Sequence, residues 1–146
     1  MGNKEPRSIV LHCSDSDSSF LDNISEIRKI HIEQRKFRDV GYHFFIRKNG
    51  AIEKGRGENE EGAHTKGFNL DKEDRVTIGI CLHGKKYFNT GQFIALAMLI
   101  NDLRKRYDIP RTSIYPHWFF NEYKTCPNFD LSTFWEIHDE IYRGKK

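Results

Sequence analysis

Two short apolar runs place the tightest limit on how this chain of 146 residues can fold. They are SIVLHCS at 8–14 and VTIGICLHG at 76–84, and β-branched residues recur in both. Short continuous apolar runs of this kind are typical of strands buried within a sheet. The sequence therefore predicts two buried strands that lie far apart in the chain and belong to one core.

The remaining segments predict a hairpin, a loop and several helices. Asn49-Gly50 joins two strand-like runs within 41–56, and this dipeptide is the strongest short hairpin signal. Residues 57–75 show no period, and a loop of that length in a compact domain is usually functional or mobile. Apolar spacing typical of helices recurs in 23–37, 90–108 and 131–143. This order predicts one α/β domain over residues 1–146, with a central mixed sheet flanked by about three helices.

Composition and charge exclude several classes of protein. Charged residues make up 31% of the chain, as in ordinary globular domains. No apolar run approaches the roughly 20 residues that cross a bilayer, and MGNKEPRSIV lacks the apolar stretch of a secretory signal. The net charge of +3 is not gathered into a nucleic-acid-binding stripe. We therefore expect a cytoplasmic monomer at synthesis, with neither a membrane nor a nucleic acid as partner.

The number and spacing of the cysteines argue against a disulfide framework. Cys13, Cys81 and Cys126 are three, an odd number, and no CxxC pair is present. Cys13 and Cys81 fall within the predicted strands, where we expect buried side chains without a chemical role. Cys126 stands in an irregular segment, so any function must come from partners that the fold brings to it.

One histidine lies where sites of α/β proteins are usually built. Strand alternation places His12 on one face near the carboxyl end of the first predicted strand, just before a polar loop. His117 and Cys126 lie in the irregular segment between the last two predicted helices. Two imidazoles and one thiolate can hold a catalytic Zn²⁺ with an open fourth position. Spacing alone also leaves open a cysteine nucleophile with a histidine base.

Five segments together resemble the zinc-dependent N-acetylmuramoyl-L-alanine amidases, the family that includes phage amidase endolysins and the peptidoglycan recognition proteins. The segments are IVLHCSDS, GYHFFIRKNGAIEKGR, GAHTKGFN, TIGICLHG and PHWFFNEYKTCPNFD. They occur in the family's order and approximate spacing, over about residues 8–138. The resemblance implies a zinc hydrolase that cleaves the amide between the lactyl group of N-acetylmuramic acid and L-Ala in bacterial peptidoglycan.

The resemblance also implies a role for individual residues of the centre. It implies that His12, His117 and Cys126 are the Zn²⁺ ligands. It further implies that Tyr42, in GYHFFI, is the catalytic tyrosine and that Lys124, two residues before the cysteine, is a catalytic lysine.

The substrate groove is where the chain both follows the family and departs from it. The resemblance implies substrate contacts for His64 and Asn69, in GAHTKGFN. Many relatives carry an arginine soon after the second histidine ligand, where this chain has Trp118-Phe119. Many carry glycine after the Cys-Pro pair, where Asn128 stands here. Both departures bear on the groove and leave the metal ligands unaffected.

The expected protein is thus a small phage-type endolysin that has no signal peptide and acts on the cell wall after release. One alternative is a non-catalytic peptidoglycan-binding module on the same fold. Relatives of that kind typically lose the cysteine ligand, so Cys126 argues against it. A cysteine hydrolase with Cys126 as nucleophile and His117 as base is the other alternative, and it leaves His12 and Lys124 without a task.

Overall fold

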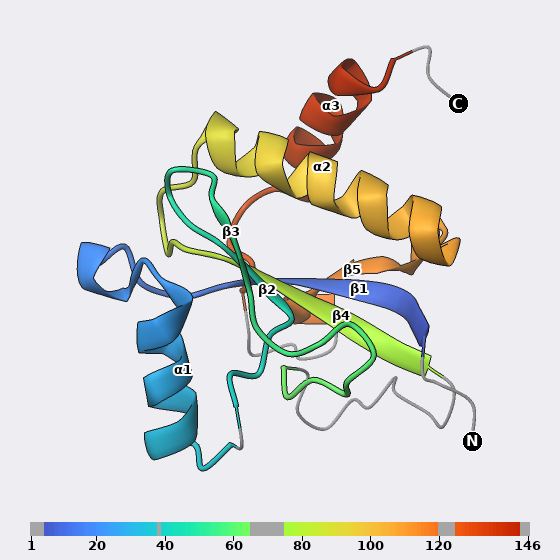
Figure 1. Cartoon of the computed structure of the whole chain (residues 1–146). Coiled ribbons are helices and arrows are strands. Elements are labelled where there is room, and N and C mark those ends of the chain that lie inside the picture. Colours follow the sequence, from blue (N-terminus) through green and yellow to red (C-terminus); the bar gives the residue numbers. More distant parts are fainter. Residues whose placement is uncertain (1–4, 38, 65–74, 120–124, 144–146) are drawn as a thin grey trace.

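The computed structural model describes residues 5–37, 39–64, 75–119 and 125–143. Its centre is a five-stranded mixed sheet with the strand order β3-β2-β4-β1-β5 (Figure 1). The strands are β1 Glu5–Cys13, β2 Phe44–Ile46, β3 Ile52–Lys54, β4 Arg75–Leu82 and β5 Ile114–Pro116. β1 lies between β4 and β5 and is parallel to both, while β2 is parallel to β4 and antiparallel to β3.

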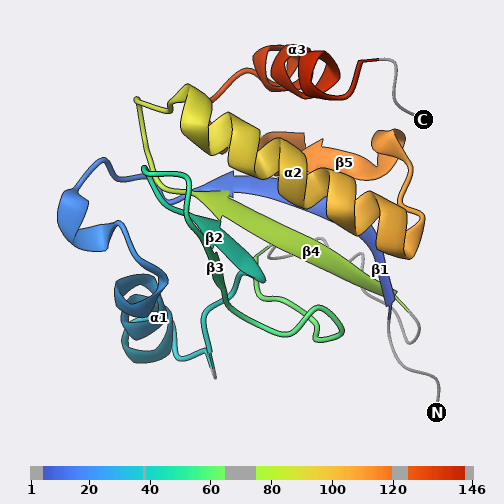
Figure 2. The same cartoon turned by 45° about the horizontal axis from the view of Figure 1, so that its top comes forward.

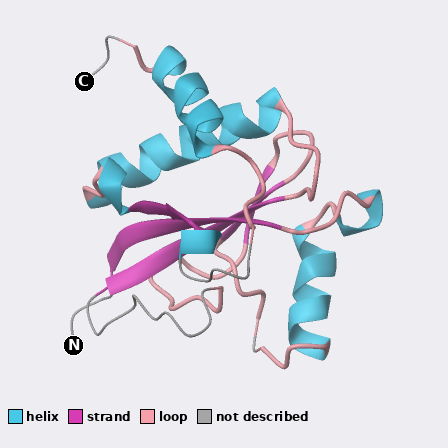
Figure 3. Ribbon diagram, turned by 180° about the vertical axis from the view of Figure 1, so that it is seen from behind, coloured by secondary structure: helices cyan, strands magenta, loops and turns pink. Residues whose placement is uncertain are grey.

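Helices cover both faces of this sheet. α2 (Thr90–Tyr107) and α3 (Leu131–Ile141) lie on one side, and α1 (Ile24–Glu33) lies on the other (Figures 1 and 2). The view from behind shows the same two layers around the strands (Figure 3). Short 3₁₀ turns join the elements: η1 Ser19–Leu21, η2 Arg111–Ser113 and η3 His117–Phe119. The predicted α/β fold with a mixed sheet and about three helices is confirmed.

The two apolar runs are the central strands because both of their faces meet apolar side chains. Ile9 and Leu11 of β1 pack into the larger core, which α2 and α3 cover. Cys81 of β4 points to the other face and packs into a smaller core with Ile24 and Ile27 of α1. Burial on both faces explains why these runs are continuous rather than alternating. Cys13 and Cys81 are buried, as predicted.

Local capping explains where the helices begin. The Asn23 side chain accepts a hydrogen bond from the Glu26 amide, 2.9 Å away, and so starts α1. Asn89 and Gln92 form a reciprocal capping box at the start of α2. The Asp130 side chain caps α3 by accepting a hydrogen bond from the Ser132 amide, 3.0 Å away. None of the described helices is both long and apolar enough to cross a membrane.

Two predicted elements are shorter in the structure than the sequence indicated. The helix predicted over 23–37 ends at Glu33, because Lys36 adopts a left-handed φ of 59° and the chain turns back so that Phe37 contacts His31. The hairpin at 41–56 pairs only three residues per strand, with Gly50 at a φ of 85° in its turn. Residues 57–64 form neither helix nor strand, and 65–74 lie outside the described residues.

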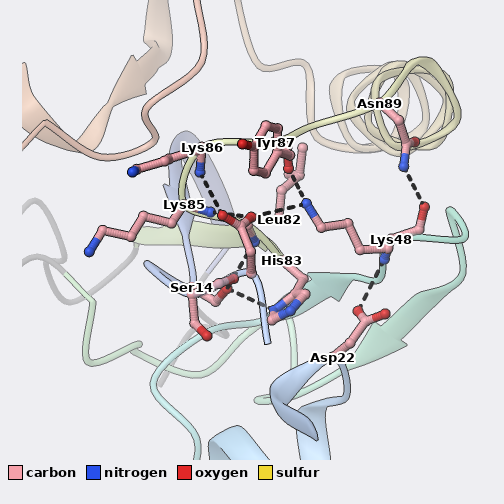
Figure 4. Close-up of polar contacts among 12 residues, drawn as sticks. Ser14, Asp22, Lys48, Leu82, His83, Lys85, Lys86, Tyr87 and Asn89 are labelled. Atoms are coloured by element: carbon pink, nitrogen blue, oxygen red, sulfur yellow. Dashed lines mark hydrogen bonds and ion pairs between the residues drawn. The ribbon is translucent and has the colours of Figure 1, made fainter. Parts of the chain in front are cut away.

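Polar side chains fasten the loops at the carboxyl ends of the parallel strands (Figure 4). The Ser14 hydroxyl lies 2.8 Å from Nδ1 of His83, whose Nε2 lies 2.7 Å from the Ser18 carbonyl oxygen. The Asn89 amide group donates to the Lys48 carbonyl at 2.8 Å, and the Lys48 backbone amide donates to Asp22. These contacts tie the loop after β1 to the β2–β3 turn and to the start of α2. Hydrogen bonds therefore connect the loops at the carboxyl ends of the strands to one another.

Candidate metal centre and active site

Three predicted metal ligands converge at the carboxyl ends of β1 and β5. His12 stands near the end of β1, His117 begins η3 directly after β5, and Cys126 lies in the loop that precedes α3. One potential ligand atom from each lies within 4.8 Å of the other two. The rings of His12 and His117 have centroids 4.4 Å apart. A thiol and two imidazoles at this separation fit the donor set of a catalytic zinc site.

Strand pairing explains why the two histidines meet. β1 and β5 are parallel neighbours in which Leu11 is paired with Pro116, so His12 and His117 follow at the same level of the sheet. The first lies near the centre of the sheet and the second at its edge.

Backbone groups hold Cys126 against these strands. The Cys13 amide donates a hydrogen bond to Sγ of Cys126, with a nitrogen–sulfur distance of 2.7 Å. The Trp118 amide donates to the Cys126 carbonyl oxygen at 2.9 Å. Contact with the Cys13 thiol, followed by burial, raises the pKa of Cys126. Thiolate formation at Cys126 therefore depends on a cation nearby.

His64 supports the outer side of His12. Its Nδ1 lies 2.9 Å from Nε2 of His12, and its Nε2 lies 2.9 Å from the Thr77 carbonyl oxygen. Burial, together with His43 nearby, lowers the pKa of His64 to about 3, so its ring is neutral at pH 7. Since a carbonyl can only accept, Nε2 of His64 carries the hydrogen and Nδ1 accepts one from His12.

This chain of hydrogen bonds fixes which nitrogen of His12 can bind a metal. Burial is the main cause that lowers the pKa of His12, with His64 and His117 adding to it, so this ring is neutral as well. A neutral His12 that donates from Nε2 keeps its lone pair on Nδ1. Metal-binding histidines commonly donate their other ring nitrogen in this way.

The ring of His64 packs against the backbone of two glycines. A Cβ on Gly79 would lie 2.7 Å from Cδ2 of His64, and one on Gly62 would lie 2.4 Å from the same atom. Both positions therefore exclude larger residues as long as His64 stays in place. The resemblance implies a substrate contact for His64, which stays a prediction, and the geometry shows this residue as the hydrogen-bond partner of His12.

Tyr42 flanks the same histidine from the side of α1. Its ring centroid lies 5.1 Å from that of His12 and 5.4 Å from that of His31. Burial raises the pKa of Tyr42 well above its usual value, and the thiols of Cys81 and Cys126 add to this. Its hydroxyl therefore keeps its proton at neutral pH and can donate a hydrogen bond.

Two other histidines hold the backbone around the centre. His43 is fully buried; its Nδ1 accepts from the Gly79 amide at 3.0 Å, and its Nε2 donates to the Glu60 carbonyl at 2.7 Å. His31 accepts from the Gly41 amide at 2.8 Å. These bonds link β4 and α1 to the segment that carries Tyr42 and His64, so both histidines serve the fold.

Of the remaining predicted site residues, Lys124 and Asn69 lie outside the described part of the chain. Sequence reasoning missed the Cys13 amide and the Thr77 carbonyl as supports of the centre, since neither backbone group has a sequence signature. It also gave no role to Tyr115, the central residue of β5, which stands two positions before His117.

Comparison with known proteins agrees with this geometry. Residues 2–129 match the family model described as N-acetylmuramoyl-L-alanine amidase. The endolysin of Klebsiella phage KP32 is 33% identical over 150 residues, which cover 94% of this chain and 91% of that protein. The endolysin of Escherichia phage T7 is 34% identical over 141 residues, covering 91% and 87%.

Among solved structures, the N-acetylmuramoyl-L-alanine amidase LysC from Clostridium intestinale URNW has 30% identity and a TM-score of 0.75. The match covers 95% of this chain and 87% of that structure. Drosophila PGRP-LB, at 22% identity and a TM-score of 0.67, shares the fold. The resemblance seen in the sequence motifs is thereby confirmed, and the chain belongs to the N-acetylmuramoyl-L-alanine amidase family.

Proposed function

We propose that this protein is a zinc-dependent amidase that cleaves the bond between the lactyl group of N-acetylmuramic acid and L-Ala in peptidoglycan. The convergence of His12, His117 and Cys126 is the observation that carries this proposal. Three protein ligands of this kind leave a fourth position open for water or substrate. Similarity to phage endolysins over nearly the whole chain supports a role in cell-wall lysis after release.

Residues around the metal would each have a separate role in the reaction. When bound, Zn²⁺ supplies a water of lowered pKa and polarises the scissile carbonyl. His64 holds His12 in the tautomer that binds through Nδ1. Tyr42 is neutral and lies beside His12, and its hydroxyl donates a hydrogen bond to the substrate oxygen that gains negative charge. By its place two residues before Cys126, Lys124 adds a cationic donor to the same oxygen.

The substrate residues and partners belong to the same proposal. Peptidoglycan is the substrate, with Asn69 and the exposed part of His64 as contacts, and the protein acts as a monomer without nucleic acid or membrane. A non-catalytic binding module would not need a thiol next to the two imidazoles, because it would not need a metal centre. A cysteine hydrolase would leave His12 and its support by His64 without a task.

Digestion of purified peptidoglycan should release stem peptides that begin with L-Ala and leave glycan strands without new reducing ends. Hydrolysis of the lactyl amide creates an L-Ala amino terminus and a lactyl carboxylate, and it leaves every glycosidic bond intact. Mass spectrometry of the products and a reducing-sugar assay measure them. A chelator should stop the release, and added Zn²⁺ should restore it.

Each competing activity would give a different set of ends. New reducing sugars would identify a glycosidase, and new D-Ala or diamino-acid termini would identify a peptidase. Hydrolysis that resists the chelator but stops quickly on thiol alkylation would identify a cysteine hydrolase. No release at all, with Zn²⁺ bound, would favour the binding module.

His64→Ala should weaken zinc binding by about 10- to 100-fold, because loss of an outer hydrogen bond to a metal-binding histidine typically costs that much. Competition with a chromophoric chelator measures the affinity. His64→Asn keeps an acceptor near the position of Nδ1 and should recover most of it. Equal zinc affinity in the wild type and in His64→Ala would show that the bond to His12 does not orient the ligand.

A further inference from the structure

Three aromatic residues lie beside the candidate metal centre and have no part in the proposed chemistry. They are Tyr115 of β5 and Trp118 and Phe119 of η3, and together we call them the aromatic ledge. Trp118 is 51% exposed and Phe119 is 60% exposed. Single exposed apolar side chains are common, so the feature that distinguishes these two is their position next to the metal centre. The rings of Tyr115 and Phe119 are stacked, with centroids 5.2 Å apart and an interplanar angle of 29°. Exposed apolar surface gathered next to a site commonly marks a place of binding.

Strand register places the ledge on the catalytic face of the sheet. Tyr115 is paired with Val10, and Ile114 is paired with Ile9. Ile9 and Ile114 point into the core beneath α2 and α3. Because side chains alternate along a strand, Tyr115 points to the opposite face, which is the face of His12. Phe119 stacks on Tyr115 and therefore lies on that face as well.

The ledge is joined directly to two of the proposed ligands. His117, Trp118 and Phe119 are consecutive in η3, where successive side chains point about 120° apart. His117 turns toward His12, so the two aromatic side chains flank it. The Trp118 amide also donates to the Cys126 carbonyl oxygen. A substrate group that rests on the ledge would thus be held at a fixed place relative to the metal ligands.

The described side chains differ between the two sides of the centre. The three side chains of the ledge, at the β5 edge, are uncharged. Across β1, the residues that follow β4 include Lys85 and Lys86, whose backbone amides donate to the Asp17 carboxylate, so two ammonium groups and one carboxylate lie there. Asn128, two residues after Cys126, donates to the Lys85 carbonyl at 3.0 Å, which places this segment against the Cys126 loop. The side chains of both lysines extend away from the network around Lys48 and His83 (Figure 4).

The proposed substrate also has an uncharged arm and an anionic arm. Because the argument uses this substrate, the inference rests on the proposed function. From the scissile amide one arm is glycan, whose pyranose rings offer flat C–H faces, and the other is a peptide that bears free carboxylates. Aromatic rings favour apolar faces, while carboxylates favour the lysine side. We propose that the aromatic ledge is a sugar subsite that binds a pyranose ring of the glycan strand.

Nuclear magnetic resonance of the zinc-loaded protein tests this placement directly. The chain has two tryptophans, so its indole N–H groups give two signals, and Trp118→Phe assigns them. Peptide-free GlcNAc–MurNAc strands should shift the Trp118 signal. They should leave the Trp135 signal in place, because Trp135 lies in α3 with the Arg111 guanidinium 3.8 Å from its ring centroid. A stem peptide that begins with L-Ala should move neither signal.

Kinetics on a soluble disaccharide-peptide give a second readout. The double variant Trp118→Ala, Phe119→Ala should raise KM about tenfold or more, the scale of losing one aromatic contact. It should leave zinc content and kcat near the wild-type values, because the ledge touches no reacting atom. Trp118→Phe should recover part of the loss. Met98→Ala removes another exposed apolar side chain, from α2 on the opposite side of the sheet, and should change nothing.

The results separate the subsite from the reaction. If the wild type hydrolyses the amide but glycan strands leave the Trp118 signal unmoved, or the double variant keeps its KM, the sugar subsite is overturned and the amidase stands. A shift caused by stem peptide alone would assign the ledge to the peptide arm and overturn it too. If the amide stays intact while glycan still moves the Trp118 signal, the subsite stands and the amidase fails.

Discussion

Cys126→Ser should lose its tightly bound zinc and about 10³-fold or more of its amide hydrolysis, falling toward the uncatalysed rate. The wild type should contain about one zinc ion per chain, held by two imidazoles and one thiolate. A serine hydroxyl does not ionise near neutral pH and is a poor substitute for a thiolate. It also leaves the donated hydrogen bond of the Cys13 amide with a weaker acceptor. Elemental analysis and single-turnover hydrolysis of a soluble muropeptide measure the two losses.

A matched cysteine provides the control. Cys81 is equally free of disulfides but is buried in β4, within the small core beneath α1. Cys81→Ala should keep its zinc, with a modest loss of thermal stability from the cavity. His12→Ala should behave like Cys126→Ser. Zinc retained at full occupancy in Cys126→Ser, or hydrolysis that continues without zinc, would contradict the proposed ligand set.

Tyr42→Phe should lower kcat by about 10²–10³-fold while KM and zinc content stay close to the wild type. The substitution removes only the hydroxyl, so the ring keeps its contacts with His12 and His31. An interaction made with developing charge contributes to the transition state and little to the bound substrate. Steady-state kinetics with parallel zinc analysis measure the effect.

Lys124→Ala is expected in the same range, since the family resemblance implies a second donor to the same oxygen. Full turnover in both variants would mean that neither residue takes part in the reaction. Loss of zinc in Tyr42→Phe would instead make the hydroxyl a support of the metal centre.

The sequence predicts best those elements whose pattern is local. β1 and β4 are continuous apolar runs, and α2 carries its own capping box and apolar stripe, so each can be recognised in isolation. β5 cannot, because three residues are too few to show alternation, and its strand conformation comes from pairing with β1. α1 ends early because of a left-handed residue at Lys36, where no glycine marks the turn.

The candidate site divides in the same way. His12, His117 and Cys126 could be named from motifs whose order is preserved along the chain, and the structure brings them together. The bond between His12 and His64 joins residues 52 positions apart and has no local signature. Its acceptor at Thr77 is a backbone carbonyl, which every residue possesses. Supports of this kind become visible only when the strands are placed side by side.

The unequal positions of His12 and His117 in the sheet bear on how fast a bound ion could leave. His12 belongs to a strand with partners on both sides, whereas His117 follows a three-residue strand that pairs on one side only. Edge segments with few ladder hydrogen bonds open locally at a much smaller free-energy cost than central strands. An ion held by His12, His117 and Cys126 would lose one of its three ligands each time the β5 edge opens, long before the molecule unfolds. The rate at which it leaves the protein would therefore depend on the fluctuations of one short edge strand as well as on global stability.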